Sequence, residues 1–320
     1  MSQARSPTSA DPKCSLVVPV YRNAAGIARL LERVRELDRR VGGLECVFVV
    51  DGSPDDSYAR LKEALPAEPY PSQLVLLSRN FGTWAAVRAG LSVAKGAYFA
   101  VMSADLQEPA ETILEFFDVL RRDQADVAIG VRAGRDDPLT AQLAARSYWA
   151  AYRQLVQKDI PAGGIDMFAC NQRVKDVLLA LDEANSSLVG LVIWLGFRRH
   201  EVSYRRQPSV NEKSGWNFRR KVRYMLDSVF SFTDLPILLL LVVGLLGICG
   251  AFAVGAFVFG SWALGLIEVQ GYTPIMLTVL FLVFANLLGL GIVGSYVWRT
   301  YENTKRRPLY VVMERDDFRR

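Results

Sequence analysis

Short apolar runs alternate with amphipathic segments over the first two thirds of the chain. The apolar runs, which predict buried strands, are 14–20, 44–50, 74–77, 97–102, 126–131 and 165–169. The amphipathic segments, which predict helices, are 25–40, 57–65, 83–95, 112–121, 139–156 and 174–181. Ile27, Leu31 and Val34, for example, share one helical face. This alternation predicts an α/β domain whose mostly parallel sheet is covered by helices on both faces.

Two longer apolar segments follow this domain. No charged residue occurs in 235–261, nor between Glu268 and Arg299. A helix needs about 20 apolar residues to cross a bilayer. The sequence therefore predicts a hairpin of two transmembrane helices, roughly 235–262 and 274–298, joined by a short loop.

Basic residues on both sides of the hairpin predict its orientation. From Arg198 to Arg223 there are nine Lys or Arg residues and two acidic ones, and further basic residues follow at Arg299 and 305–307. By the positive-inside rule both ends are cytosolic. Segment 216–233 predicts a basic amphipathic helix in the interface of an anionic leaflet, with an ordinary core-facing helix as the alternative. We expect a multi-pass protein of the cytoplasmic membrane with a cytosolic α/β domain.

Composition agrees with this organisation. The chain has 320 residues, a net charge of +5 and 51% hydrophobic residues, and the two apolar segments account for the apolar excess. We divide it into a disordered tail (1–13), the α/β domain (14–215), the interfacial helix (216–233), the hairpin (234–299) and a cytosolic C-terminal tail (300–320).

Two residue types exclude some chemistries. His200 is the only histidine, which argues against a histidine-based zinc site and against a Ser-His-Asp triad. The four cysteines show no paired spacing and lie in apolar surroundings. We interpret them as buried thiols in a reducing compartment.

Polar clusters follow the first four predicted strands. They are Pro19-Val20-Tyr21-Arg22-Asn23, Val50-Asp51-Gly52-Ser53, Ser78-Arg79-Asn80-Phe81-Gly82 and Ser103-Ala104-Asp105-Leu106-Gln107-Glu108-Pro109. Each cluster alone indicates no more than a turn. In open α/β sheets, however, ligands bind beyond the carboxyl ends of the strands, which is where all four clusters lie.

In this order and spacing, the clusters resemble the nucleotide-sugar-binding half of family 2 glycosyltransferases. The resemblance covers roughly residues 14–312 and is greatest to the polyprenyl-phosphate glycosyltransferases related to dolichyl-phosphate mannose synthase. It implies a GT-A-type domain and an inverting enzyme that transfers one sugar from a UDP- or GDP-sugar to undecaprenyl phosphate. It also implies a homo-oligomer, such as a tetramer, and no nucleic-acid partner.

The resemblance assigns the donor and metal sites. The implied donor-binding residues are Pro19, Tyr21, Asn23, Asp51, Arg79, Gly82, Ser103 and Asp105. Mg²⁺ or Mn²⁺, which prefer oxygen ligands, are expected at Asp105 and Gln107. The family segment Asp-Ala-Asp-Leu-Gln-Asp-Pro differs here at Ser103 and Glu108, and Val50 stands where an acidic neighbour of Asp51 is usual. A helix cap is the alternative for Asp105, and a surface salt bridge for Arg79.

Later segments of the chain carry the implied catalytic and acceptor residues. Gly164-Ile165-Asp166-Met167-Phe168 corresponds to the family's Gly-Asp-Phe-Arg pattern, so the resemblance implies a catalytic carboxylate at Asp166, with Phe168 in place of the arginine. The implied phosphate and acceptor residues are Arg132, Arg135, Arg205, Arg206, Lys213 and Ser214. For the last four, a solvated basic face touching lipid headgroups is the alternative.

Two other functions remain open on the sequence. A processive polysaccharide synthase is one, although its Gln-x-x-Arg-Trp motif and its additional spans are absent from this sequence. A catalytically silent membrane scaffold is the other, favoured by Ser103, Val50 and Phe168. The four positions Asp51, Asp105, Gln107 and Asp166 argue for catalysis.

Overall fold

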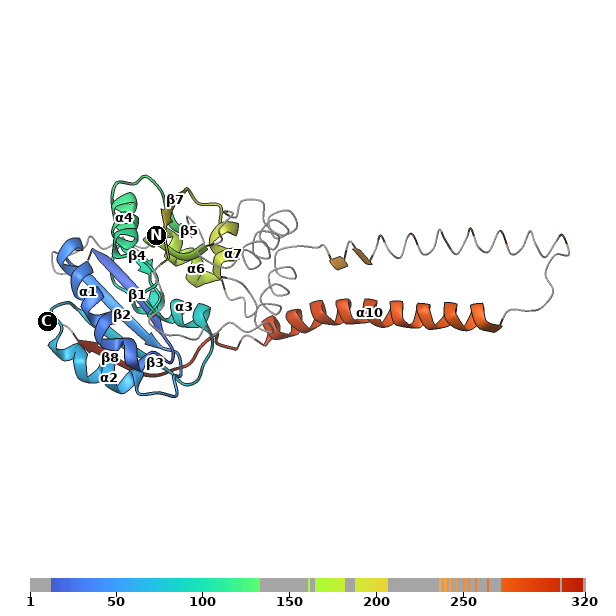
Figure 1. Cartoon of the computed structure of the whole chain (residues 1–320), viewed down its shortest axis with the longest axis horizontal. Helices are drawn as coiled ribbons and strands as arrows, with labels where there is room; N and C mark the ends of the chain where they lie inside the picture. The colour runs from blue at the N-terminus through green and yellow to red at the C-terminus, as the bar shows by residue number, and fades with distance from the viewer. Residues whose placement is uncertain are drawn as a thin grey trace, which may run out of the picture. The chain divides into compact units, whose positions relative to one another are not determined.

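The computed structural model describes residues 13–132, 161, 165–181, 188–206, 272–305 and 307–318, with scattered positions between 236 and 264. The chain divides into two compact units, Met1–Lys221 with Arg307–Arg320, and Val222–Arg306. The first unit contains a sheet of eight strands in the order β7-β5-β6-β4-β1-β2-β3-β8 (Figure 1).

The strands are β1 (Cys14–Val20), β2 (Leu44–Val50), β3 (Ser72–Leu77), β4 (Tyr98–Val101), β5 (Val127–Arg132), β6 (Ile165–Asn171), β7 (Arg199–Tyr204) and β8 (Val312–Phe318). The helices of the first unit are α1 (Ile27–Val41), α2 (Ser57–Ala64), α3 (Thr83–Val93), α4 (Ala110–Arg121), α6 (Gln172–Ala180) and α7 (Leu188–Trp194). Two short 3₁₀ turns, Ala24–Gly26 and Leu65–Ala67, adjoin α1 and α2.

The predicted α/β domain with a mostly parallel sheet is confirmed. Strands β4, β1, β2 and β3 run parallel to one another, as do β5 and β7. Two strands run the other way: β6 between β4 and β5, and β8 along the outer side of β3. The carboxyl ends of all the parallel strands therefore share one edge, where β6 and β8 begin.

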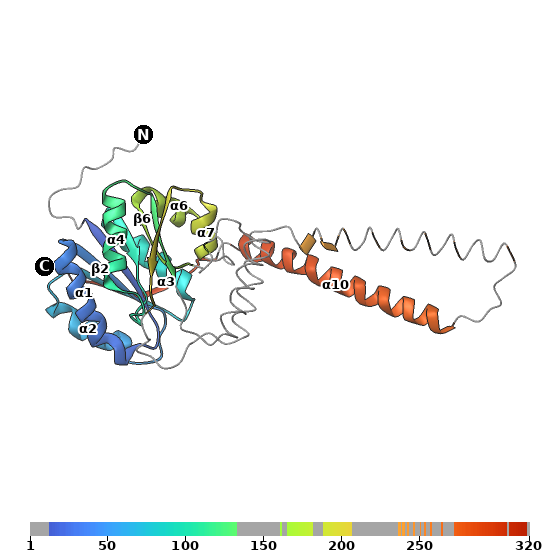
Figure 2. The same ribbon diagram turned by 45° about the horizontal axis from the view of Figure 1, so that its top comes forward.

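Alternate residues of the strands face two helical layers. Leu16, Val18 and Phe48 belong to the core cluster that also contains the buried side chains of α1 and α4. Val17 and Val49 point the other way and contact α3, where a Cβ added to Gly90 would lie 2.3 Å from Val17 Cγ1. Figures 1 and 2 show α1, α2 and α4 on one face of the sheet and α3 and α6 on the other. The predicted covering of both faces is thus confirmed.

Strand β8 corrects the prediction that 300–320 is a tail. It forms the edge of the sheet by pairing with β3, from Ser72↔Phe318 to Leu77↔Val312. Its sequence, VMERDDF, carries four charges and lacks the apolar alternation that predicts a strand. Charged side chains are usual on edge strands, because they oppose pairing with another chain. The helix α7, Leu188–Trp194, was not among the predicted helices. The predicted helix 139–156 lies outside the described residues.

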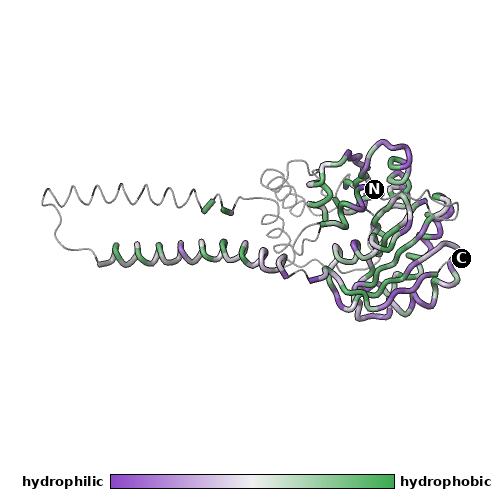
Figure 3. The backbone as a smooth tube through the Cα atoms, turned by 180° about the vertical axis from the view of Figure 1, so that it is seen from behind, coloured by the Kyte–Doolittle hydropathy of each residue, from purple (hydrophilic) through white to green (hydrophobic). Residues whose placement is uncertain are grey.

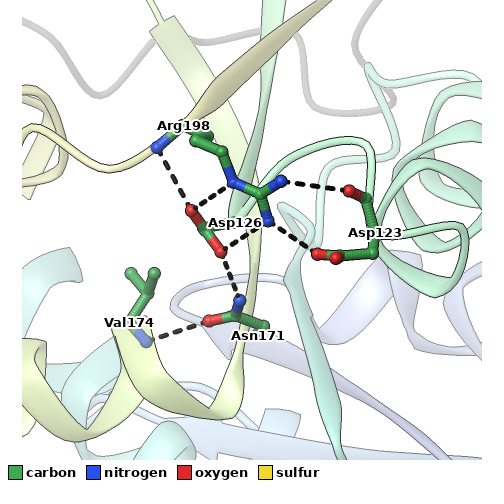
Figure 4. A network of polar contacts seen from close by, with 5 residues as sticks. All are labelled: Asp123, Asp126, Asn171, Val174 and Arg198. Carbon is green, nitrogen blue, oxygen red and sulfur yellow. Dashed lines mark hydrogen bonds and ion pairs between the residues drawn. The ribbon is translucent and has the colours of Figure 1, made fainter.

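A polar network fixes the far ends of β5, β6 and β7. The Arg198 guanidinium donates to the Asp126 carboxylate, with Nε at 3.1 Å from Oδ2, and also pairs with Asp123 (Figure 4). Asn171 donates to Asp126 Oδ1 at 3.0 Å and accepts from the amide of Val174 at the start of α6. The hydrogen bond from Arg198 lowers the pKa of Asp126 below its ordinary value. One carboxylate thus ties together three strands and a helix terminus.

The second unit contributes the helix α10 (Tyr272–Thr304). In Figure 3 its turns are coloured mostly as hydrophobic. Within the part of the chain that the structure describes, no helix combines the length and the apolar character that crossing a membrane requires. Segment 216–233 lies outside the described residues, as does most of 235–262.

Candidate active site

The polar clusters predicted to bind ligands all follow strands that end at the same edge of the sheet. Going across the sheet from β7 to β8, this edge carries Arg205 and Arg206, then Arg132, Asp166, the Ser103–Pro109 segment, Tyr21 to Asn23, Asp51 to Ser53, and Ser78 to Gly82. Neighbouring strands lie about 4.8 Å apart, so segments distant in the sequence come within reach of one small ligand.

Hydrogen bonds join the loops of neighbouring strands along this edge. The buried side chain of Asn23, after β1, donates to the carbonyl of Ala104, after β4, at 2.8 Å. The amide of Arg22 donates to Ser53 Oγ, after β2, at 2.7 Å. Arg22 has a φ of 50°, a left-handed conformation that is uncommon for a residue other than glycine. The β1 loop is therefore held from both sides.

Asp51 holds the loop that follows β3. We call residues 78–82 the donor loop. Asp51 Oδ1 accepts from the amide of Phe81 at 2.7 Å, and Oδ2 accepts from the amide of Gly82 at 2.9 Å. Burial raises the pKa of Asp51, although both amides and the charge of Arg79 oppose this rise. Both carboxylate oxygens are thus occupied in shaping the donor loop, a role that the sequence did not indicate.

Gly52 allows the donor loop to approach closely. Its φ is 54°, and a Cβ at this position would lie 2.2 Å from the carbonyl carbon of Arg79 and 2.5 Å from the amide nitrogen of Asn80. These are backbone atoms, so a side chain could be accommodated only by moving the loop. Arg79 itself stacks on the ring of Phe81, with Cζ at 4.0 Å from the ring centroid. The surface salt bridge considered for Arg79 is absent from the ion pairs of the described residues.

Asp55 is a further organising carboxylate that the sequence analysis missed. Its Oδ1 accepts from Ser53 Oγ at 2.6 Å and from Ser57 Oγ at 2.7 Å, and its Oδ2 accepts from the amide of Ala24 at 3.0 Å. Burial alone would raise the pKa of Asp55, but these hydrogen bonds together lower it. The Ser-Pro-Asp-Asp-Ser pattern, typical of local side-chain to backbone hydrogen bonding, was the available signal.

A cavity of about 230 Å³ opens among these loops. It is lined by Pro19, Val20, Tyr21, Asn23, Asp51, Thr83, Ala86, Val101, Ser103, Ala104 and Asp105. Six of the eight predicted donor-binding residues therefore lie together. Arg79 and Gly82 adjoin the cavity through Asp51 but do not line it. Thr83 and Ala86, from the first turn of α3, were not predicted, because no polar pattern distinguishes them.

The Ser103–Pro109 segment could hold a divalent cation. Ser103 Oγ lies 3.0 Å from Asp105 Oδ1 and 3.3 Å from Glu108 Oε1, and the amide of Gln107 donates to Asp105 Oδ1 at 3.4 Å. No group of three or more His, Cys, Asp or Glu residues arranged for a metal occurs among the described residues. Mg²⁺ commonly takes one or two carboxylates and completes its shell with phosphates and water. Asp105 can supply one such carboxylate. The side-chain amide of Gln107 remains a prediction as the second ligand.

The backbone of β6 places Asp166 at the same edge. Gly130 pairs with Met167 and Val131 with Ile165, so Asp166 is the extra residue of a β-bulge. Bulges often re-aim a side chain beside an active site. On its other side, β6 pairs with β4 up to Ala100↔Ala169. Extending that register by three residues brings position 166 level with position 103. The side chain of Asp166 lies outside the described part.

Two of the predicted phosphate-binding segments are neighbours. Arg132, which ends β5, pairs with Tyr204 of β7, and Arg205 follows directly as an exposed residue together with Arg206. The backbone register thus places residues 132, 205 and 206 near one another; β5 lies two strands away from β4, and β7 lies three strands away. The remaining predicted residues, Arg135, Lys213 and Ser214, lie outside the described residues.

The fold and this edge define an α/β protein whose ligand site lies at the carboxyl ends of its parallel strands. The family model for glycosyl transferase family 2 matches residues 15–176, about half of the chain. The chain is also 30% identical over 302 residues to the uncharacterized glycosyltransferase sll0501 of Synechocystis sp., a match that covers 94% of each. The chain belongs to glycosyl transferase family 2, and it is a glycosyltransferase.

Other relatives have more specific names. The chain is 28% identical over 311 residues to the bactoprenol glucosyl transferase of Shigella phage SfX, covering 95% of this chain and 99% of the relative. It is 27% identical over 302 residues to the prophage bactoprenol glucosyl transferase homolog of Escherichia coli K12, and the match covers 94% of this chain and 98% of the relative. Among solved structures, the mannosyltransferase PcManGT from Pyrobaculum calidifontis, in complex with GDP-Man and Mn²⁺, has a TM-score of 0.46 at 15% identity, covering 91% of this chain and 88% of that one.

We predict that Gly52→Ala lowers the affinity for UDP or GDP at least about tenfold, because the new methyl group displaces the donor loop. Gly42→Ala is the matched control, since Gly42 also has a positive φ, 66°, but has no atom within 4 Å of an added Cβ. Each substitution costs about 1–2 kcal/mol of stability for the left-handed conformation. Calorimetric titration measures the affinities. Equal affinities of the two variants would show that the donor loop does not shape the nucleotide site.

Proposed function

We propose that this enzyme transfers one sugar, with inversion, from a UDP- or GDP-sugar to a polyprenyl phosphate at the cytoplasmic face of a membrane. The observation that carries the proposal is the order of groups along one sheet edge. Along the sheet, the strands whose loops line the cavity with Asp51 and Asp105 lie on one side of position 166, and the strands that end at Arg132 and before Arg205 and Arg206 lie on the other. Two phosphate-bearing substrates can thus meet at Asp166.

The cavity suits the nucleotide half of the donor. Its lining includes Pro19, Tyr21 and Asn23 from the end of β1 and the loop after it, and Thr83 and Ala86 from α3. A planar base can pack against these small and aromatic groups, and its diphosphate then extends towards Asp105. Asp105 would hold a bound Mg²⁺ or Mn²⁺, which would neutralise the charge that develops on the diphosphate leaving group.

The acceptor needs positioning more than activation. A phosphate monoester is already anionic near neutral pH, so its oxygen can attack the anomeric carbon without prior proton removal. The new bond joins that oxygen to the anomeric carbon, while the bond from the anomeric carbon to the nucleotide diphosphate breaks. Arginine binds phosphate oxygens bidentately, which is the role we propose for Arg132, Arg205 and Arg206. Asp166 orients the reacting groups at the anomeric centre.

The apolar C-terminal segments support the part of the proposal that places the enzyme at a membrane. Large apolar side chains of α10, including Ile275, Leu282 and Leu290, are each more than half exposed. Near the end of α10, Lys305 Nζ lies 5.3 Å from the ring centroid of Trp298 and 4.2 Å from that of Tyr301. Aromatic residues with an adjacent lysine are typical of the membrane–water interface. The names of the bactoprenol glucosyl transferases also favour a lipid acceptor.

The proposed reaction is tested by transfer of radiolabel from a panel of UDP- and GDP-sugars to undecaprenyl phosphate, with Mg²⁺ or Mn²⁺. We expect one labelled lipid product. Asp166→Asn should lower its formation at least about 100-fold with little change in nucleotide affinity, because the residue acts at the anomeric centre. Asp105→Ala should abolish transfer at every concentration of Mg²⁺ or Mn²⁺.

Asp56→Asn is the control for these variants, since Asp56 is an exposed carboxylate near the same edge. It should transfer sugar at the wild-type rate. A large loss of nucleotide affinity in Asp166→Asn would refute the role given to Asp166. Absence of transfer with every donor, in folded protein, would favour the silent scaffold.

We predict that the loop between the two spans faces away from the cytosol. A cysteine introduced as Glu268→Cys should react with a membrane-impermeant maleimide in intact cells, whereas Arg307→Cys should react only after permeabilisation. Cys14, Cys46 and Cys170 are buried, so only Cys249, which lies outside the described residues, is first replaced by alanine. Labelling of Arg307→Cys in intact cells would reverse the orientation, and extraction of the protein by alkaline carbonate would contradict the spans. Light scattering of the solubilised protein tests the proposed homo-oligomer.

A further inference from the structure

The residues just before β8 contact the donor loop and the helix α3 that follows it. Because β8 is antiparallel to β3, it begins where β3 ends. The amide of Ser78, the first residue of the loop, donates to the carbonyl of Val311 at 3.0 Å. The hydroxyl of Tyr310 donates to Ser92 Oγ at 3.1 Å, on the helix α3 that follows the loop. Two consecutive residues, Tyr310 and Val311, thus contact the first residue of the donor loop and the helix that follows the loop.

The strand pairing is irregular at this point. Leu77 pairs with Val312 but Leu76 pairs with Glu314, so Met313 is an extra residue, and its side chain is exposed. A bulge increases the local twist of a strand and can change its direction. The bulge therefore gives the first residues of β8 a direction different from that of the rest of the strand, at the place where the chain passes the loop.

The remainder of β8 is attached independently. Lys62 pairs with Glu314 and Asp316, and the hydroxyl of Tyr58 donates to Asp316 at 3.1 Å. Farther along, Lys95 Nζ lies 2.8 Å from Asp317 Oδ2. The Arg315 guanidinium also donates to Gln73 Oε1, at 2.7 Å. These contacts can keep the strand in register when its first residues are altered.

We propose that residues 310–312 are a positioning segment for the donor site. They hold the donor loop from the β8 side, while Asp51 and Gly52 hold it from the β2 side, so that the Phe81 and Gly82 amides stay on the Asp51 carboxylate. The proposal rests on the proposed function only in assigning this loop to nucleotide binding.

Residues 310–312 come after α10 in the sequence, although they belong to the same unit as the donor loop. Tyr310 comes six residues after Thr304, the last residue of α10. The donor site is therefore completed by residues that follow the membrane hairpin in the sequence. A protein ending before the hairpin, such as the 14–215 domain, lacks this positioning segment and should bind nucleotide more weakly than the full chain.

The test compares two double glycine variants of the full-length protein in detergent. Tyr310→Gly/Val311→Gly removes the hydroxyl bonded to Ser92 and loosens the carbonyl bonded to Ser78. Asp316→Gly/Asp317→Gly is the matched control, since it places two glycines in the adjoining strand β8 and removes contacts far from the loop. The Lys62–Glu314 and Arg315–Gln73 contacts, which remain, hold the strand in register. Hydrogen exchange is measured at the amides of Phe81 and Gly82, with β3 amides reporting the integrity of the sheet. Calorimetry measures the binding of UDP and of GDP, each with Mn²⁺.

We expect the first variant to increase exchange at Phe81 and Gly82 about tenfold and to weaken nucleotide binding three- to tenfold, with β3 still protected. The control should change both quantities less than about twofold. Equal exchange at the donor loop in the two variants would overturn the proposal, as would increased exchange with unchanged nucleotide affinity. If the wild-type protein binds neither nucleotide, the proposed function fails, and exchange alone decides whether the segment positions the loop.

Discussion

The bond between one buried carboxylate and two backbone amides organises the site of this enzyme. Asp51 lies at the end of a fully buried strand and uses its two oxygens on the amides of Phe81 and Gly82. Burying a charged carboxylate is costly, and the hydrogen bonds from these amides offset part of that cost. The donor loop is consequently fixed against β2, and α3 starts at the place where its first turn lines the cavity.

Hydrogen bonds between neighbouring loops occur across the rest of the sheet edge as well. Each loop at the carboxyl edge, from β4 to β8, is joined to its neighbour by at least one hydrogen bond: Ala104 to Asn23, Arg22 to Ser53, Asp51 to the donor loop, and Ser78 to Val311. Rigid positioning matters for phosphoryl-bearing substrates, because a glycosyl acceptor and donor react only when oxygen and anomeric carbon are held in line. The antiparallel strands β6 and β8 add Asp166 and residues 310–312 to an edge that parallel strands alone would have left incomplete.

Most of the strands and many of the residues that line the cavity could be predicted from the sequence, for reasons that particular residues make clear. The strands of the first half were predicted because burial on both faces gives continuous apolar runs such as 44–50. The family resemblance, carried by polar clusters at strand ends, named six residues that the fold brings together in one cavity. Strand β8 could not be predicted, because it forms by pairing with β3, a segment over 230 residues earlier in the sequence.

The hydrogen bonds of Asp51 to the donor loop, and of Asp55 to the hydroxyls of Ser53 and Ser57, could not be predicted either, because they depend on how the loops fold. Ser103 shows the reverse case: the sequence revealed a missing carboxylate, and the structure shows a hydroxyl beside Asp105 and Glu108 in its place.

The most direct test of this account is a structure of the full-length protein with Mn²⁺ and the nucleotide that it binds, with the metal located by anomalous scattering. The account predicts the nucleotide in the cavity between Pro19 and Asp105, manganese beside the Asp105 carboxylate, and Asp51 still accepting from Phe81 and Gly82. Nucleotide bound elsewhere, or a donor loop released from Asp51 when the nucleotide is bound, would contradict it.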